Sequence, residues 1–186
     1  ALDELWRQSG NDDFVREMAP VVFRAVQGAL NHAVDEHGFL THGDGETWMD
    51  GGGEANPYSP RGNRAVEVQA LWHRGLEVAA RLARRFEGQA AGLTGEELAR
   101  RYDAAAEQLR ASFQRRFVVD GRVIDHLNTD GSADIQHRPN GLLAIMATLK
   151  PMEIQSHRDR IITIFFAYFI NITSLFLSES LFTALY

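Results

Sequence analysis

The side chains best suited to chemistry lie in the segment TWMD, where one methionine separates Trp48 from Asp50. An indole offers a flat apolar face to the C–H surface of a sugar ring, and a nearby carboxyl group serves the sugar oxygens. Glycines and prolines follow in GGGEANPYSP, which favours a sharply bent loop that keeps its shape. The segment therefore predicts a sugar-binding site. The alternative is that Trp48 belongs to the core and Asp50 caps a turn or a helix.

Glu67 is a second candidate, because positions 67, 71 and 74 share one face of a predicted helix whose flank is partly apolar. A buried carboxylate needs a partner, and Arg61 or Arg64 can supply it. Such a pair is either a structural salt bridge or an orienting pair inside a pocket.

Other chemistries have less support in the sequence. A possible metal group lacks the fixed helical spacing of a known motif; its members are His37, His42, Asp44 and Glu46. The glycines 51–53 are not followed by the Lys-Ser or Lys-Thr of a phosphate loop, and no serine has the flanking glycines of a nucleophile elbow. A metal site and a phosphate site are therefore the weaker interpretations, and a serine hydrolase has little support.

Composition narrows the class of protein and its partners. The length of 186 residues, with 45% hydrophobic and 24% charged residues, is ordinary for one globular domain. A net charge of -6 disfavours nucleic acid as a partner and suits an uncharged or cationic ligand. The absence of cysteine excludes disulfides and thiolate metal sites, and it is compatible with a reducing compartment, so we expect a cytoplasmic protein.

Helical periodicity dominates the elements that must position these residues. Apolar stripes predict helices over 11–33, with a kink or break at Pro20, over 63–86, with Asn63 as N-cap, and over 94–117, with a Thr94/Glu97 capping box. A short β-hairpin with a type I′ turn is expected around Asp120 and Gly121, and a helix with Pro139 in its first turn should reach about residue 149. The prediction is an all-α fold of antiparallel hairpins, in a solenoid or a toroid, with one small β-hairpin.

The composition changes near residue 160. The segment IITIFFAYFINITSLFLSESLFTALY contains Glu179 as its one charged residue. About 20 apolar residues can span a bilayer, but polar residues interrupt this run, so a membrane is not the expected partner. The alternative interpretations are that this segment forms a buried helix pair or that it is a tail foreign to the preceding domain. We therefore divide the chain into a domain at 1–150 and an apolar tail of uncertain origin at 151–186.

Three motifs carry a resemblance to a known family. GETWMD, SPRGNRAVEVQALWHRGL and HRPNGLLA resemble, in order and spacing, the α-1,6-glucosidase domain of glycogen debranching enzymes, especially the bacterial and archaeal type, over roughly residues 2–149. The resemblance implies part of an (α/α)6 toroid and an inverting glycosidase that needs no metal or organic cofactor. Its substrate would be the glucose that remains α-1,6-linked at a branch point of an α-glucan such as glycogen or limit dextrin.

The resemblance also implies roles for individual residues. Asp50 would be the general acid, and the substrate-binding residues would be Trp48, Arg61, Glu67, Asp134 and Arg138. Gly141 departs from the pattern, since the family commonly has Gln after RPN. The family's general base lies nearer the C-terminus, in a segment that this chain lacks, so we expect the fragment to be nearly inactive. Uncovered helix faces would favour self-association. The alternatives are a non-catalytic carbohydrate-binding or scaffold module, and a membrane-anchored helical protein.

Overall fold

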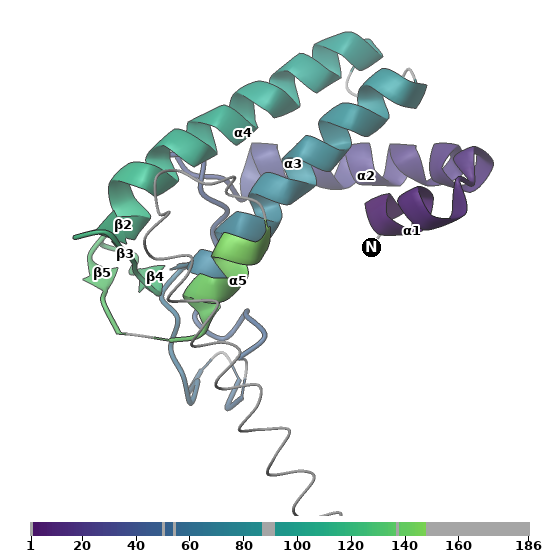
Figure 1. Ribbon diagram of the computed structural model, residues 1–186. Helices are drawn as coiled ribbons and strands as arrows, with labels where there is room; N and C mark the ends of the chain where they lie inside the picture. Colours follow the sequence, from purple (N-terminus) through teal and green to yellow (C-terminus); the bar gives the residue numbers. More distant parts are fainter. Residues whose placement is uncertain (1, 50, 54, 87–91, 137, 148–186) are drawn as a thin grey trace, which may run out of the picture. The chain divides into compact units, whose positions relative to one another are not determined.

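The computed structural model describes residues 2–49, 51–53, 55–86, 92–136 and 138–147 (Figure 1). The chain divides into two units, Ala1–Leu149 and Lys150–Tyr186, and everything described below belongs to the first. The predicted apolar tail therefore lies outside the described residues. Among the helices that the structure describes, none is both long and apolar enough to cross a bilayer.

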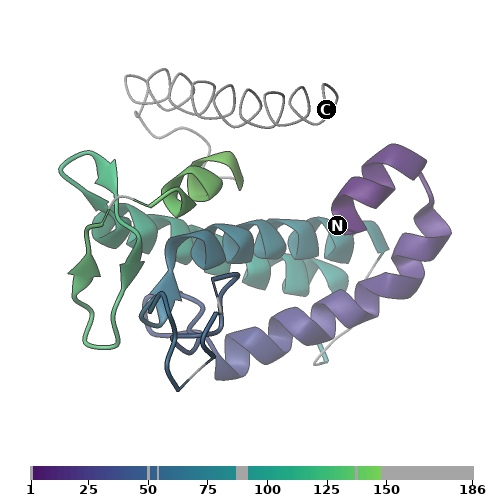
Figure 2. The same cartoon turned by 90° about the horizontal axis from the view of Figure 1, so that it is seen from below.

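The described fold is mainly helical, which confirms the predicted class. Its helices are α1 (Leu2–Ser9), α2 (Asp12–His32), α3 (Val66–Phe86), α4 (Gly95–Phe117) and α5 (Asn140–Ala147). Helix α3 is central, because it packs against α2, α4 and α5 (Figures 1 and 2). Side chains from α2, α3 and α4 form the core, including Phe23, Leu76, Leu98, Leu109 and Phe113.

Local signals set several boundaries as the sequence predicts. The Thr94 hydroxyl accepts a hydrogen bond from the Glu97 backbone N–H at 3.3 Å, and a Glu97 carboxylate oxygen accepts one from the Thr94 N–H at 2.8 Å. This is the predicted capping box. In the hairpin of β2 (Val118–Val119) and β3 (Arg122–Val123), Asp120 and Gly121 both have positive φ, as a type I′ turn requires.

Two predicted helix signals are resolved by the structure. Of the kink or break predicted at Pro20, the break does not occur: α2 continues through Pro20, which is exposed, so the carbonyl that loses its partner can be solvated. Asn63 is not the N-cap of α3, since β1 (Arg64–Ala65) intervenes. The Asn63 N–H instead donates to the Leu127 carbonyl at 3.2 Å, in line with the pairing of the next strand.

A small sheet that the sequence does not predict joins the start of α3 to the segment before α5. Its order is β1–β4–β5, with β4 at His126–Leu127 and β5 at Ala133–Asp134, and both pairings are antiparallel. Each strand has only two residues, too few for a visible alternation pattern. The sheet brings residues near 125 beside those near 61 and 67, and so it builds the site.

Candidate functional site

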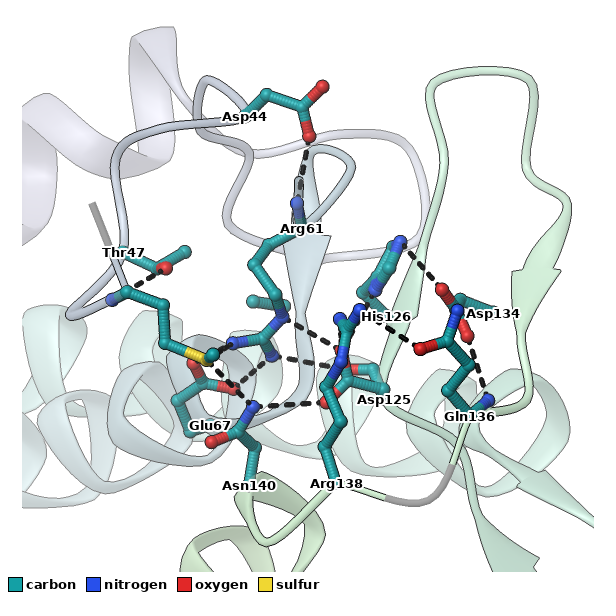
Figure 3. Close-up of polar contacts among 12 residues, drawn as sticks. Asp44, Thr47, Arg61, Glu67, Asp125, His126, Asp134, Gln136, Arg138 and Asn140 are labelled. Atoms are coloured by element: carbon teal, nitrogen blue, oxygen red, sulfur yellow. Dashed lines mark hydrogen bonds and ion pairs between the residues drawn. The ribbon is translucent and has the colours of Figure 1, made fainter. Parts of the chain in front are cut away.

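Arg61 is the centre of a buried polar network at the N-terminal end of α3 (Figure 3). Its side chain has no exposed surface. Its Nη1 donates to Glu67 Oε1 at 2.9 Å and its Nη2 to Glu67 Oε2 at 2.7 Å, which is a bidentate pair. Arg64 instead pairs with Asp35 at 2.6 Å. Of the two arginines that the sequence offered, Arg61 is therefore the partner of Glu67.

Asp125 is the second member of the network, and the sequence reasoning missed it. Its Oδ2 lies 2.8 Å from Arg61 Nε and 2.8 Å from Arg138 Nη1, and it accepts from His126 Nδ1 at 2.9 Å. Its Oδ1 accepts from Asn140 Nδ2 at 3.0 Å. Asp125 stands in VIDHLN without a periodic or motif signal, so its partners become visible only once the chain has folded.

The surroundings of Asp125 keep it ionised. Burial by itself raises the pKa of this carboxyl group, but hydrogen bonds from His126, Asn140 and Arg138 and the charge of Arg61 outweigh that effect. The result is a pKa of about 2. A carboxylate with so low a pKa, and with both oxygens engaged, is a poor proton acceptor near neutral pH. Asp125 therefore holds the guanidinium groups of Arg61 and Arg138, and the N–H groups of His126 and Asn140, in place.

Asp134 and Arg138, both predicted to bind substrate, lie at the edge of the same network. Arg138 reaches Asp125 as described and also donates to Gln136 Oε1 at 3.2 Å. Asp134 Oδ2 lies 3.7 Å from His126 Nε2, and its Oδ1 accepts from the Gln136 backbone N–H at 2.7 Å. Both side chains keep some exposure, Arg138 at 20% and Asp134 at 18%, so a ligand can still reach them.

The TWMD loop meets the network through Met49. The Met49 sulfur accepts from Arg61 Nη1 at 3.4 Å and from Asn140 Nδ2 at 3.6 Å, the contacts drawn to the yellow atom in Figure 3. Trp48 is 64% exposed, so the alternative that it is a core residue is wrong. Asp50, the predicted general acid, lies outside the described residues. The exposed Trp48 indole therefore lies next to Met49, whose sulfur contacts the buried network.

Glycine shapes the loop where backbone segments approach closely. Gly52 has φ +92°, and a Cβ there would lie 2.3 Å from the Asn56 carbonyl oxygen. Gly62 has φ +57°, and a Cβ there would lie 2.5 Å from the Leu127 carbonyl oxygen. Neither contact is possible for a residue with a side chain. The second glycine lets the segment after Arg61 lie directly against β4, next to Asp125.

The group considered for a metal is divided among separate contacts. His42 Nε2 accepts from the Ala65 N–H at 2.8 Å, so its Nδ1 carries the hydrogen and donates to the Gly43 carbonyl at 2.7 Å. Asp44 accepts from the Arg61 N–H at 2.9 Å, Glu46 accepts from the Gly43 N–H at 2.6 Å, and His37 lies 3.5 Å from Glu36. Among the described residues no cluster suited to a metal ion occurs.

Comparison with known proteins gives one finding. A family model described as amylo-alpha-1,6-glucosidase matches residues 1–170, which is most of the chain and extends past residue 150 into the apolar tail. No curated protein matches the chain, and neither does any solved structure.

Proposed function

Because the chain belongs to the amylo-alpha-1,6-glucosidase family, we propose that it forms part of a glycoside hydrolase that removes α-1,6-linked glucose at the branch points of glycogen or limit dextrin. The observation that carries this proposal is the exposed Trp48, next to a buried network that braces Met49. An exposed indole on a braced loop suits the face of a sugar ring. The remainder of the proposed (α/α)6 toroid would come from sequence beyond the described residues.

We assign the role of general acid to Asp50, by the match of TWMD to the family pattern. Inverting hydrolysis also needs a general base, roughly 6.5–9.5 Å from the acid, to activate a water molecule. The two buried carboxylates near the loop do not suit that role, because Glu67 is paired with Arg61 and Asp125 has a pKa of about 2. This supports our expectation that the fragment has little or no activity by itself.

Glucose release from a branched limit dextrin tests the proposal. We expect at most slow release by this chain, because neither Glu67 nor Asp125 suits the role of general base, and faster release by a longer chain that also supplies such a base. Asp50→Asn in the longer chain should reduce the rate by at least about 100-fold, since general acid catalysis contributes factors of this size. Rapid release by the short chain, lost in its Asp50→Asn variant, would show that a base is present among its own residues.

A second candidate function is a non-catalytic module that binds an α-glucan. It is favoured by the engagement of Glu67 and Asp125 in ion pairs. Titration of the chain with glucose oligomers, followed by Trp fluorescence, examines binding apart from hydrolysis. Binding without activity in both the short and the longer chain would favour the module. No binding in either would contradict both candidates.

A further inference from the structure

Met49 is a connection between the exposed loop and the buried network. A thioether is a weak hydrogen-bond acceptor and usually fills gaps in apolar cores. Here it faces a guanidinium N–H of Arg61 and an amide N–H of Asn140, and both of those side chains are fully buried. The neighbouring Thr47 hydroxyl also accepts from the Met49 backbone N–H at 3.2 Å.

Both donors to the sulfur are fixed by the same carboxylate. Asp125 Oδ2 lies 2.8 Å from Arg61 Nε, and Asp125 Oδ1 accepts from Asn140 Nδ2 at 3.0 Å. Asp125 Oδ2 therefore orients Arg61, which precedes β1, and Asp125 Oδ1 orients Asn140, the first residue of α5. Arg61 is held further by its backbone N–H, which donates to Asp44 on the same loop at 2.9 Å.

We propose that Asp125, Asn140 and Arg61 are positioning residues for the sugar-binding loop, acting through the sulfur of Met49. Trp48 is largely exposed, so core packing cannot fix its orientation, and the attachment of the next residue takes that role. The inference deepens the proposed function and rests on it, because the loop that these residues hold is the one assigned to the glucan. Asp125 and Asn140 have no assigned role in that function.

The positioning can be measured without any ligand. The chain contains Trp6, Trp48 and Trp72, so labelling with 5-fluorotryptophan provides a ¹⁹F probe at each, and Trp48→Phe assigns the resonance of interest. Met49→Leu removes the acceptor at nearly constant volume, and Met18→Leu on α2 is the matched control. We expect Met49→Leu to shift or broaden the Trp48 resonance alone, whereas Met18→Leu leaves that resonance in place.

A second variant covers the case in which Met49→Leu disturbs the whole fold, which would move the Trp6 and Trp72 resonances as well. Asn140→Ala removes one donor and leaves the sulfur, and it should likewise move the Trp48 resonance while those of Trp6 and Trp72 stay in place. A Trp48 resonance that is unchanged in a folded Met49→Leu or Asn140→Ala chain would overturn the proposal.

Glucan binding separates this inference from the proposed function. Loss of one hydrogen bond corresponds to about a two- to tenfold weaker affinity. Met49→Leu removes the acceptor of two, so we expect at least that loss of glucan affinity in Met49→Leu and none in Met18→Leu. Equal glucan affinity in the two variants would contradict the positioning role. If the unmodified chain binds no glucan, the proposed function fails, while the ¹⁹F comparison still decides whether Met49 positions Trp48.

Discussion

At the scale of single residues, the charged side chains at the centre of the site are buried, whereas the neighbouring indole of Trp48 is exposed to solvent. Asp125 and Arg61 are buried, and their polar atoms contact one another and nearby side chains. Trp48 is exposed although an indole carries a large apolar surface. An exposed aromatic side chain beside a buried network of ion pairs and hydrogen bonds is an arrangement that can receive a ligand without reorganising the core.

The low pKa of Asp125 predicts how stability depends on pH. The folded-state pKa of about 2 is below the reference value of 3.8, so ionised Asp125 stabilises the fold above about pH 4. That contribution, on the order of 2 kcal/mol, is lost as the pH falls through 3.8 towards 2. Urea denaturation of the unmodified chain and of Asp125→Asn, between pH 6 and pH 2, measures it.

The two stability curves should lie furthest apart above pH 4 and converge near pH 2. If Asp125→Asn does not fold, the titration of the Asp125 carboxyl ¹³C signal in the unmodified chain gives the pKa directly. Asp13→Asn, at a largely exposed position of α2, should change the free energy of unfolding little. Curves for Asp125→Asn that stay parallel to the unmodified chain down to pH 2 would contradict the prediction.

At the scale of elements, the short sheet β1–β4–β5 positions the site more than the long helices do. Pairing of Arg64 with Leu127, and of Ala65 with His126, places the segment that carries Arg61 beside Asp125. The pairing depends on the close approach at Gly62. A helix contributes the remaining contacts, since Glu67 lies in the first turn of α3 and Asn140 begins α5.

Gly62→Ala tests the importance of this approach, and Gly53→Ala is its matched control. Both glycines have positive φ, +57° and +69°, so both variants carry the cost of about 1 kcal/mol for a left-handed alanine. A Cβ at Gly53 meets nothing within 4 Å, whereas one at Gly62 would overlap the Leu127 carbonyl oxygen. We expect Gly62→Ala to lower the free energy of unfolding by at least about 2 kcal/mol more than Gly53→Ala does. Equal losses for the two variants in urea denaturation would refute this.

At the scale of the whole molecule, α3 is packed against three other helices and yet carries an apolar side chain in solvent. Leu71 is 63% exposed, and Leu143 of α5, a helix that packs against α3, is 47% exposed. Apolar side chains that gather at a surface favour association. The prediction that the chain leaves helix faces uncovered and self-associates can therefore be tested at these positions.

We therefore expect the chain to self-associate. Leu71→Ser should weaken the association by roughly ten- to a hundredfold, because burying a leucine contributes about 1.5–3 kcal/mol. Sedimentation velocity over a range of concentrations measures the association constant. Val119→Ser in the β2–β3 hairpin removes an exposed apolar side chain elsewhere and should have a smaller effect. A monomer at all concentrations, or equal effects of the two variants, would exclude the α3 face as the contact.

The sequence by itself determined the features that depend on neighbours along the chain. Helical periodicity predicts α2, α3 and α4, the Thr94/Glu97 pair predicts the start of α4, and Asp120–Gly121 predicts the hairpin turn. Pro139 predicts the last helix, although α5 begins at the next residue, Asn140. These signals are reliable because the interacting groups lie within about four residues of one another. The sequence left the partner of Glu67 open between Arg61 and Arg64, because both arginines are near Glu67 along the chain.

Tertiary structure alone decided which polar groups meet across the fold. Asp125 contacts Arg61, which lies 64 residues earlier, and this contact exists only because two-residue strands bring the segments together. The exposure of Trp48 likewise depends on how much core surrounds the loop, which no local pattern records. Burial and long-range pairing are properties of the packed chain, and so the network that contacts Met49 could not be inferred from residue types and spacing.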